Sequence, residues 1–281
     1  MPGARLASFR EGDRSELLVE LLLSAFAFTT RVPRQEDVGF DFFCSLITKH
    51  QHLLKAGPFF AVQAKSSLDA VVYEKEHELE WISTQENPLL LCVADRKSLS
   101  VDIYSTWNLI CGPLARKATR ITLIPGVRAR DFPGVVNHSD GAQEIHLGDP
   151  ILRISDDDVS DVSRRQQIGE VLAYWIALDR TNLVNRQAGI YWVLGPTNYE
   201  TGQLPSALGG VAFYWNPVNL SQCAINLGRA GAALVLLLPE DHLWADRKKA
   251  IHEMISAYWE LFDEPVRKIL TEKGLAPTSR K

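Results

Sequence analysis

The segments "EDVGFDFFCSL" (residues 36–46) and "FFAVQAKSS" (residues 59–67) decide the fold that this chain is expected to adopt. Both are short, rich in aromatic and branched residues, and separated by about a dozen residues, which predicts two neighbouring strands joined as a hairpin. Each apolar run also carries polar residues, Asp37 and Asp41 in the first and Gln63 and Lys65 in the second.

The polar residues Asp41, Gln63 and Lys65 are expected to converge on one site. Alternate side chains of a strand share a face, so Gln63 and Lys65 project together, and the hairpin brings Asp41 across from them. Oxygens of Asp41, Gln63 and the Ala64 carbonyl suit Mg²⁺, and Lys65 could orient water or offset charge during phosphodiester cleavage. The alternative is a structural salt bridge between Asp41 and Lys65.

Further elements are expected on both sides of this hairpin. A helix is predicted to begin near Asp13, because Asp13 and Glu16 form a capping-box-like pattern before an apolar run. A second helix should end before Pro88, and strands should cover residues 89–95 and 100–106.

The second half of the chain is expected to be mainly helical. Residues 121–154 are rich in Pro and Gly, which predicts strand-like or irregular structure and a domain edge there. Residues 164–184 place apolar residues on one helical face, and Pro265 suits the first turn of a short helix. We therefore expect two domains, residues 1–155 and 156–281.

The ordered set of Glu16, Asp37-Val-Gly-Phe-Asp41 and Val62-Gln63-Ala64-Lys65-Ser66-Ser67 resembles the PD-(D/E)XK, or restriction-endonuclease-like, nuclease superfamily. More narrowly, it is similar to prokaryotic domains of unknown function with D-x-G-x-D and V-Q-x-K-S-S motifs. The resemblance covers roughly residues 10–110. It implies an α/β fold with a restriction-endonuclease-like core of helix, mixed β-sheet and helix, followed by the mainly α-helical C-terminal region.

The resemblance also implies which residues act. Glu16, Asp41 and Gln63, with the Ala64 carbonyl, would hold Mg²⁺ or Mn²⁺, and Lys65 would assist water attack. Gln63 stands where many members have an acid, and an amide is the weaker ligand, although active relatives with Gln occur. Glu20, one turn after Glu16, is a second-rank candidate that could restore the missing charge.

Two of these acids have competing structural explanations. Glu16 could serve only the capping box at its own helix terminus. Asp37 precedes Gly39 and suits a tight turn into the strand, so it is also a second-rank candidate.

The composition and charge of the chain limit the kinds of partner that it is expected to bind. The net charge of -4 excludes binding to nucleic acid through overall basicity, so any such binding must be local. A basic stretch without acids contains Arg116, Lys117, Arg120, Arg128 and Arg130, and it is either a phosphate-binding segment or a solvated strand edge. Four widely spaced cysteines, no secretory h-region and no apolar run of membrane-spanning length indicate a cytoplasmic protein without membrane contact.

Taken with the resemblance, these features predict a metal-dependent nuclease acting on nucleic acid, with DNA the expected substrate, in a prokaryotic setting such as phage defence. A homo-oligomer or a partner protein of a defence system is left open. One alternative is a catalytically inactive nuclease fold that only binds nucleic acid. Another is an interaction protein whose aromatic C-terminal helices, with Trp175, Trp244, Tyr258 and Trp259, dock a partner.

Overall fold

The computed structural model describes residues 7–33, 39–50, 53–111, 118–128, 131, 133–187 and 192–212, together with short runs between residues 249 and 277. Contacts divide the chain into two compact units. The first unit comprises Met1–Val184 and Trp192–Phe213, and the second comprises Asn185–Tyr191 and Tyr214–Lys281.

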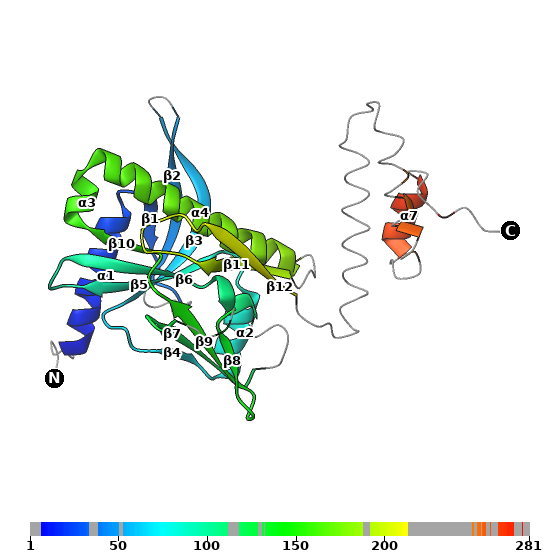
Figure 1. The fold of residues 1–281 in the computed structure, drawn as a ribbon, viewed down its shortest axis with the longest axis horizontal. Helices are drawn as coiled ribbons and strands as arrows, with labels where there is room; N and C mark the ends of the chain where they lie inside the picture. The colour runs from blue at the N-terminus through cyan, green and yellow to red at the C-terminus, as the bar shows by residue number, and fades with distance from the viewer. Residues whose placement is uncertain are drawn as a thin grey trace. The chain divides into compact units, whose positions relative to one another are not determined.

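The first unit is a mixed α/β structure, as the sequence predicts (Figure 1). Its first half contains α1 (Ala7–Leu23), β1 (Ala27–Arg31), β2 (Phe42–His50), β3 (Leu53–Lys65), β4 (Val71–Tyr73), α2 (Glu76–Thr84), β5 (Leu89–Asp95) and β6 (Ser100–Ser105). Its second half contains the 3₁₀ helix η2 (Trp107–Cys111), β7 (Arg120–Pro125), β8 (Val135–Asn137), β9 (Ala142–Gly148), β10 (Leu152–Ser155), α3 (Asp156–Ser160), α4 (Val162–Gln187), β11 (Trp192–Asn198) and β12 (Ala207–Ala212).

A six-stranded mixed sheet with the order β1-β2-β3-β5-β6-β10 forms the centre of this unit. The predicted hairpin is confirmed, because β2 pairs antiparallel with β3, with Phe42 opposite Val62. After the crossover through α2, β5 lies parallel to β3, and Lys65 is opposite Val93. The end of β3, the end of β5 and the start of β2 therefore share one edge of the sheet.

Helix α1 begins earlier than the sequence predicts. It starts at Ala7, not near Asp13, so Asp13 and Glu16 lie inside the helix. Its inner residues, among them Val19 and Leu22, are buried against the central sheet. The capping-box explanation for Glu16 is therefore wrong, because Glu16 is two turns beyond the first residue of the helix.

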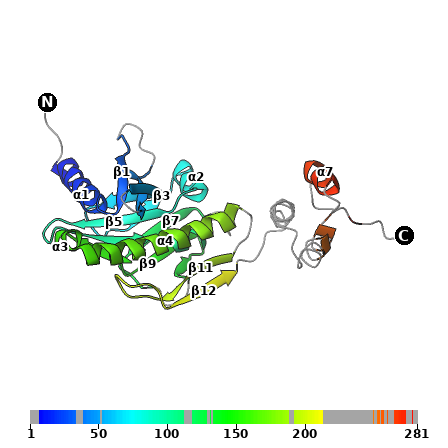
Figure 2. The ribbon, with the colours of Figure 1, turned by 90° about the horizontal axis from the view of Figure 1, so that it is seen from above.

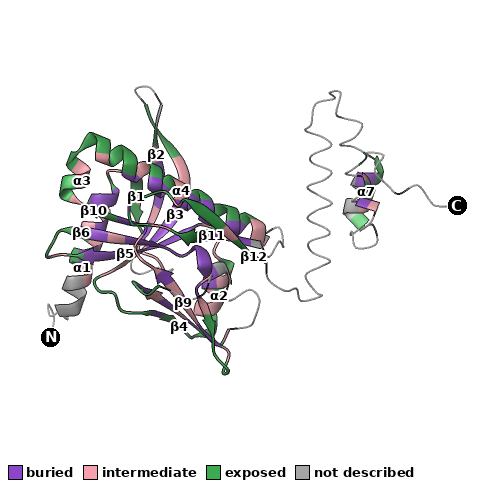
Figure 3. Ribbon diagram, in the orientation of Figure 1, coloured by how far each residue is buried: buried purple, intermediate pink, exposed green. Residues whose placement is uncertain are grey.

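Helices cover one face of the central sheet and a second sheet covers the other (Figures 1 and 2). Residues of α1 and α4 share one buried cluster with Phe60 and Val62 of β3. On the opposite face Ala61 joins a cluster with α2 and with the four-stranded sheet β4-β7-β9-β8. Figure 3 shows these buried positions along the central strands and exposed positions along the outer side of α4.

The region expected to be strand-like or irregular, residues 121–154, contains most of this second sheet and also β10. The Pro- and Gly-rich punctuation marks the turns between short strands; for example, Gly134 and Gly141 have positive φ angles of 85° and 84°. The strands themselves are only three to seven residues long, which is why their pattern is weak in the sequence.

The predicted domain boundary at residue 155 does not coincide with the observed division. Helix α4 buries Leu172 and Trp175 in the same cluster as α1 and the central sheet, so it belongs to the first unit up to Val184. No described helix, including the 26-residue α4, is long and apolar enough to span a membrane. In the second unit, α7 (Glu264–Glu272) contains Pro265 in its first turn, as expected.

Candidate active site

Asp41 lies immediately before β2, at the edge of the sheet where β3 ends. Its backbone N–H donates to the Val62 carbonyl at 2.8 Å, and its own carbonyl accepts from Val32 N–H at 2.9 Å. Asp41 is therefore held on both sides by backbone hydrogen bonds, between β1 and β3. These two hydrogen bonds fix the backbone of Asp41, and with it the point at which its side chain is attached.

The carboxylate of Asp41 extends the ladder between β2 and β3. Its Oδ2 accepts a hydrogen bond of 2.7 Å from the backbone N–H of Ala64. Within a strand the N–H and C=O of one residue point toward the same neighbour, so the Ala64 carbonyl faces the same side as this carboxylate. The structure thus brings Asp41 against the central residue of the Gln63-Ala64-Lys65 triplet.

Gln63 is half-buried, and its side chain is held by an aromatic residue that sequence reasoning did not select. The hydroxyl of Tyr73 donates to Gln63 Oε1 at 3.2 Å. Burial raises the pKa of the Tyr73 hydroxyl well above its usual value, so this group remains a donor. The amide oxygen that the sequence assigns to a metal therefore already accepts one hydrogen bond, and it retains a second lone pair.

Lys65 is half-buried at the last position of β3. Among the residues that the structure describes, its ammonium group forms no ion pair or hydrogen bond, with Asp41 or with any other group. The structural salt bridge between Asp41 and Lys65 is therefore not observed. A partly desolvated ammonium without an anion gains from any anionic ligand at this edge.

Glu16 and Glu20 project from α1 toward Arg31, the last residue of β1. Glu20 Oε2 accepts from Arg31 Nε at 2.7 Å, and Glu16 Oε2 lies 4.0 Å from Arg31 Nη1. Arg31 is paired with Phe42, the residue after Asp41, and its guanidinium carbon lies 5.7 Å from the centre of that ring. Both acids are thus near the start of β2, where they act as counter-ions of Arg31.

The donor set at this edge fits a weakly held Mg²⁺ better than a tightly bound metal. No group of three or more His, Cys, Asp or Glu suited to a metal occurs in the described parts of the chain. Among the described residues, the oxygens beside the end of β3 include the Asp41 carboxylate, which accepts the Ala64 N–H, the Ala64 carbonyl and the Gln63 amide. Only the carboxylate among these oxygen ligands is charged. Such a set suits Mg²⁺, which prefers hard oxygen ligands and usually keeps several bound waters.

Other predicted residues do not form one site. Asp37, Arg116, Lys117 and Arg130 lie outside the described residues. Arg120 is exposed at the start of β7, whereas Arg128 Nε donates to Asp149 Oδ2 at 2.5 Å. The described part of the basic stretch thus offers one exposed cation and one that is already paired.

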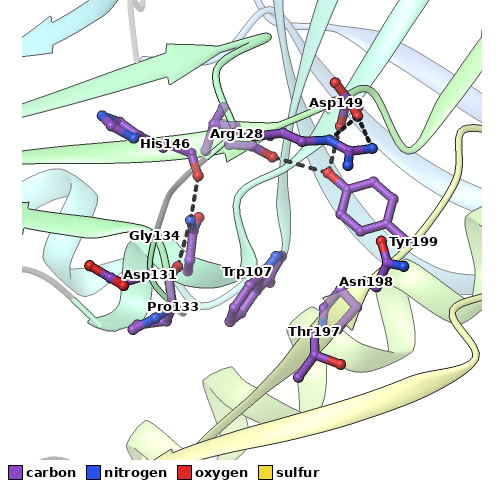
Figure 4. A pocket seen from close by; sticks show the side chains of 14 residues that line it. Trp107, Arg128, Asp131, Pro133, Gly134, His146, Asp149, Thr197, Asn198 and Tyr199 are labelled. Atoms are coloured by element: carbon purple, nitrogen blue, oxygen red, sulfur yellow. Dashed lines mark hydrogen bonds and ion pairs between the residues drawn. The ribbon is translucent and has the colours of Figure 1, made fainter.

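A separate cavity of about 300 Å³ lies between η2, the ends of β7 and β9, and β11 (Figure 4). Its polar groups mainly hold one another: Tyr199 donates to the Asp149 carbonyl at 2.6 Å, and Asn108 Nδ2 donates to the His146 carbonyl at 2.8 Å. The side chain of Arg128 lies across Asp149 at its rim (Figure 4). None of the lining residues comes from β2 or β3, so this cavity is not part of the predicted site.

Comparison of the chain with protein-family models, with curated proteins and with solved structures finds no match. Within the first unit, predicted site residues meet where the Asp41 carboxylate contacts Ala64, between Gln63 and Lys65.

Proposed function

We propose that this chain is a metal-dependent nuclease with a restriction-endonuclease-like core, which hydrolyses phosphodiester bonds of nucleic acid, preferentially DNA. One observation carries the proposal: the Asp41 carboxylate accepts the Ala64 N–H at 2.7 Å, directly between Gln63 and Lys65. The central mixed sheet, in which β1, β2 and β3 are antiparallel and β5 lies parallel to β3, follows α1 and packs with α2, which is consistent with the core of helix, mixed β-sheet and helix that the resemblance implies.

In this proposal Asp41, the Ala64 carbonyl and Gln63 would hold Mg²⁺ or Mn²⁺, which supplies Lewis acidity toward a phosphate oxygen when bound. Lys65 offsets the negative charge that develops on the phosphate, because its ammonium is half-buried and free of protein anions among the described residues. Tyr73 keeps the Gln63 amide oriented through its hydrogen bond. Glu16, which the resemblance assigns to the metal, and Glu20 contact Arg31, so they tie α1 to the end of β1 beside the proposed site.

Cleavage assays with matched variants test this proposal. Plasmid, linear duplex DNA, single-stranded DNA and RNA are incubated with Mg²⁺ or Mn²⁺ and with the wild type, Asp41→Asn or Lys65→Ala. We expect cleavage by the wild type and a loss of roughly 100-fold or more in each variant. Lys55→Ala is the control, since Lys55 is an exposed lysine on the same strand, and it should cleave as the wild type does. Cleavage that survives both site substitutions would show that the chemistry lies elsewhere.

A second candidate is a catalytically inactive member of the same fold that binds nucleic acid. The hydrogen bond from Tyr73 to Gln63 favours it, because that bond gives the amide a structural role without any metal. Binding of DNA or RNA by the wild type without cleavage under either metal would support this candidate over the first. A role in phage defence is proposed for either form, and protection of cells against phage by the wild type but not by Asp41→Asn would distinguish the active one.

A further inference from the structure

A cavity of about 580 Å³ lies beside the candidate active site, at the same edge of the central sheet. Arg14 and Leu18 of α1 form one wall, Ser66 follows Lys65 directly, and the turn between β5 and β6 forms the other wall. Figures 1 and 2 show this turn beside α1. Because β3 and β5 are parallel, their C-terminal ends open into the cavity together.

The lining of this cavity is basic. It contains three cations, Arg14, Arg96 and Lys97, and a single acid, Asp95. Arg14 and Lys97 are exposed, and neither forms an ion pair within the described residues. Three cations around a concave surface focus a positive potential that attracts anions.

The single acid of the lining, Asp95, forms hydrogen bonds within its own turn. Asp95 Oδ2 accepts from the Ser98 hydroxyl at 2.7 Å, and its Oδ1 accepts from the Lys97 N–H at 2.9 Å. The Ser98 hydrogen bond, followed by the backbone bond, holds the pKa of the Asp95 carboxyl below its usual value. Asp95 therefore shapes the turn that presents Arg96 and Lys97, and it leaves the net charge of the lining positive.

The turn is also held in an unfavourable backbone conformation. Leu99, which lines the cavity, has a φ angle of 50°, a region that branched apolar residues rarely adopt. Leu99 closes the short turn between β5 and β6, and it thereby fixes the backbone from which Arg96 and Lys97 extend.

We propose that this cavity binds the phosphate backbone of the nucleic acid next to the bond that is cleaved. The inference rests on the proposed function for its choice of a nucleic acid over other polyanions. Chain connectivity supports it: Ser66, which lines the cavity, directly follows Lys65. A phosphate held in the cavity would therefore lie next to the one at Lys65.

Equilibrium binding of fluorescent oligonucleotides, measured by anisotropy, tests this inference without requiring cleavage. Every protein carries Lys65→Ala, and the probes are duplex DNA, single-stranded DNA and RNA at several salt concentrations. We expect Arg14→Glu and Lys97→Glu each to weaken binding roughly tenfold or more, and to reduce the slope of log K against log salt by about one per lost phosphate contact. Arg14→Gln and Lys97→Gln should each weaken oligonucleotide binding less than the corresponding substitution by Glu.

Arg180→Glu is the matched control, because Arg180 is an exposed arginine of α4 outside the cavity. It makes the same change in net charge and should alter affinity by less than about threefold. Circular dichroism and thermal melting verify that each variant is folded. Unchanged affinity and salt slope in both Arg14→Glu and Lys97→Glu would overturn the inference, as would an equal loss in Arg180→Glu.

The cleavage and binding experiments distinguish a failure of the proposed nuclease activity from a failure of the proposed phosphate site. Cleavage that depends on Lys65, with binding indifferent to Arg14 and Lys97, would keep the nuclease and remove this phosphate site. Absence of cleavage, with binding that depends on Arg14 and Lys97, would keep the phosphate site and support the inactive candidate.

Discussion

The hydroxyl of Ser105 on β6 lies 3.0 and 3.1 Å from the two carboxylate oxygens of Asp179 on α4, and both residues are buried. Burial raises the pKa of the Asp179 carboxyl to about 8, and the hydrogen bond from Ser105 lowers it only in part. Asp179 is thus a protonated acid in the core near neutral pH. This pair joins α4 to the central sheet.

Asp179 makes the stability of the first unit depend on pH. Because its pKa is higher in the folded than in the unfolded chain, its contribution is most favourable below about pH 4 and is lost as the pH rises to about 8. Asp179→Asn keeps the shape and the hydrogen bond but cannot ionise. Relative to this variant, the wild type should lose up to about 1.4 kcal/mol of unfolding free energy per pH unit between pH 5 and 8. Urea unfolding across this range measures it, and parallel pH profiles would contradict the assignment.

Asp158 should show the opposite dependence. Its partial burial raises its pKa, but hydrogen bonds from Arg164 and Ser155 outweigh this and hold the pKa below the usual value. It also caps α3 together with Ser155. Asp158→Asn should therefore cost about 0.5–2 kcal/mol at pH 7, and the cost should begin to shrink below about pH 4 and be lost as the pH falls through the lowered pKa of the folded state. Denaturation at pH 7 and pH 3 gives the comparison, and a constant cost at both values would contradict the role of its charge.

The strands nearest the candidate site were predictable because local patterns determine them. The aromatic and branched content of the two segments and the short spacing between them indicated the hairpin, and the apolar run of β5 indicated the buried strand. The predicted start of α1 near Asp13 was wrong, because the helix begins at Ala7 and the capping-like pattern at Asp13 lies inside it, where Asp and Glu are also tolerated. Short strands such as β8, which has three residues and follows Gly134, show too little periodicity to be located individually.

The contacts that build the site were less predictable than its residues. Asp41 and Lys65 could be selected by their polarity within apolar strands, but the hydrogen bond of Asp41 to a backbone N–H depends on where β2 begins. The Tyr73 contact to Gln63 depends on packing between two sheets. The basic cavity joins residues 14, 66 and 97, which the parallel arrangement of β3 and β5 and the packing of α1 on the central sheet bring together.

Gln63→Glu tests whether the neutral amide limits metal binding. A second carboxylate beside Asp41 adds charge to the donor set, so the affinity for Mn²⁺ should rise about tenfold, or about 1.4 kcal/mol. Without metal, the two acids repel, and the variant should melt at a lower temperature than the wild type. Titration calorimetry and melting with and without Mn²⁺ measure both effects. Gln63→Ala is the control and should bind Mn²⁺ no better than the wild type; equal affinity in all three proteins would exclude Gln63 as a ligand.

Gly39 lies just before β2, two residues before Asp41, so its backbone conformation affects the position of Asp41. Its φ angle is 82°, and an added Cβ atom would lie 2.7 Å from Cζ2 of Trp81. Gly39→Ala therefore meets both a backbone penalty of about 1–2 kcal/mol and a clash with a half-buried ring. We expect it to lower the unfolding free energy by about 2 kcal/mol or more and to reduce cleavage by displacing the Asp41 carboxylate.

Gly169→Ala is the matched substitution for this prediction. Gly169 lies within α4, and nothing is within 4 Å of its added Cβ, so alanine should stabilise the helix by up to about 1 kcal/mol. Thermal unfolding and cleavage of the two variants are compared under the same conditions. If Gly39→Ala were as stable and as active as Gly169→Ala, the turn before β2 would not position Asp41.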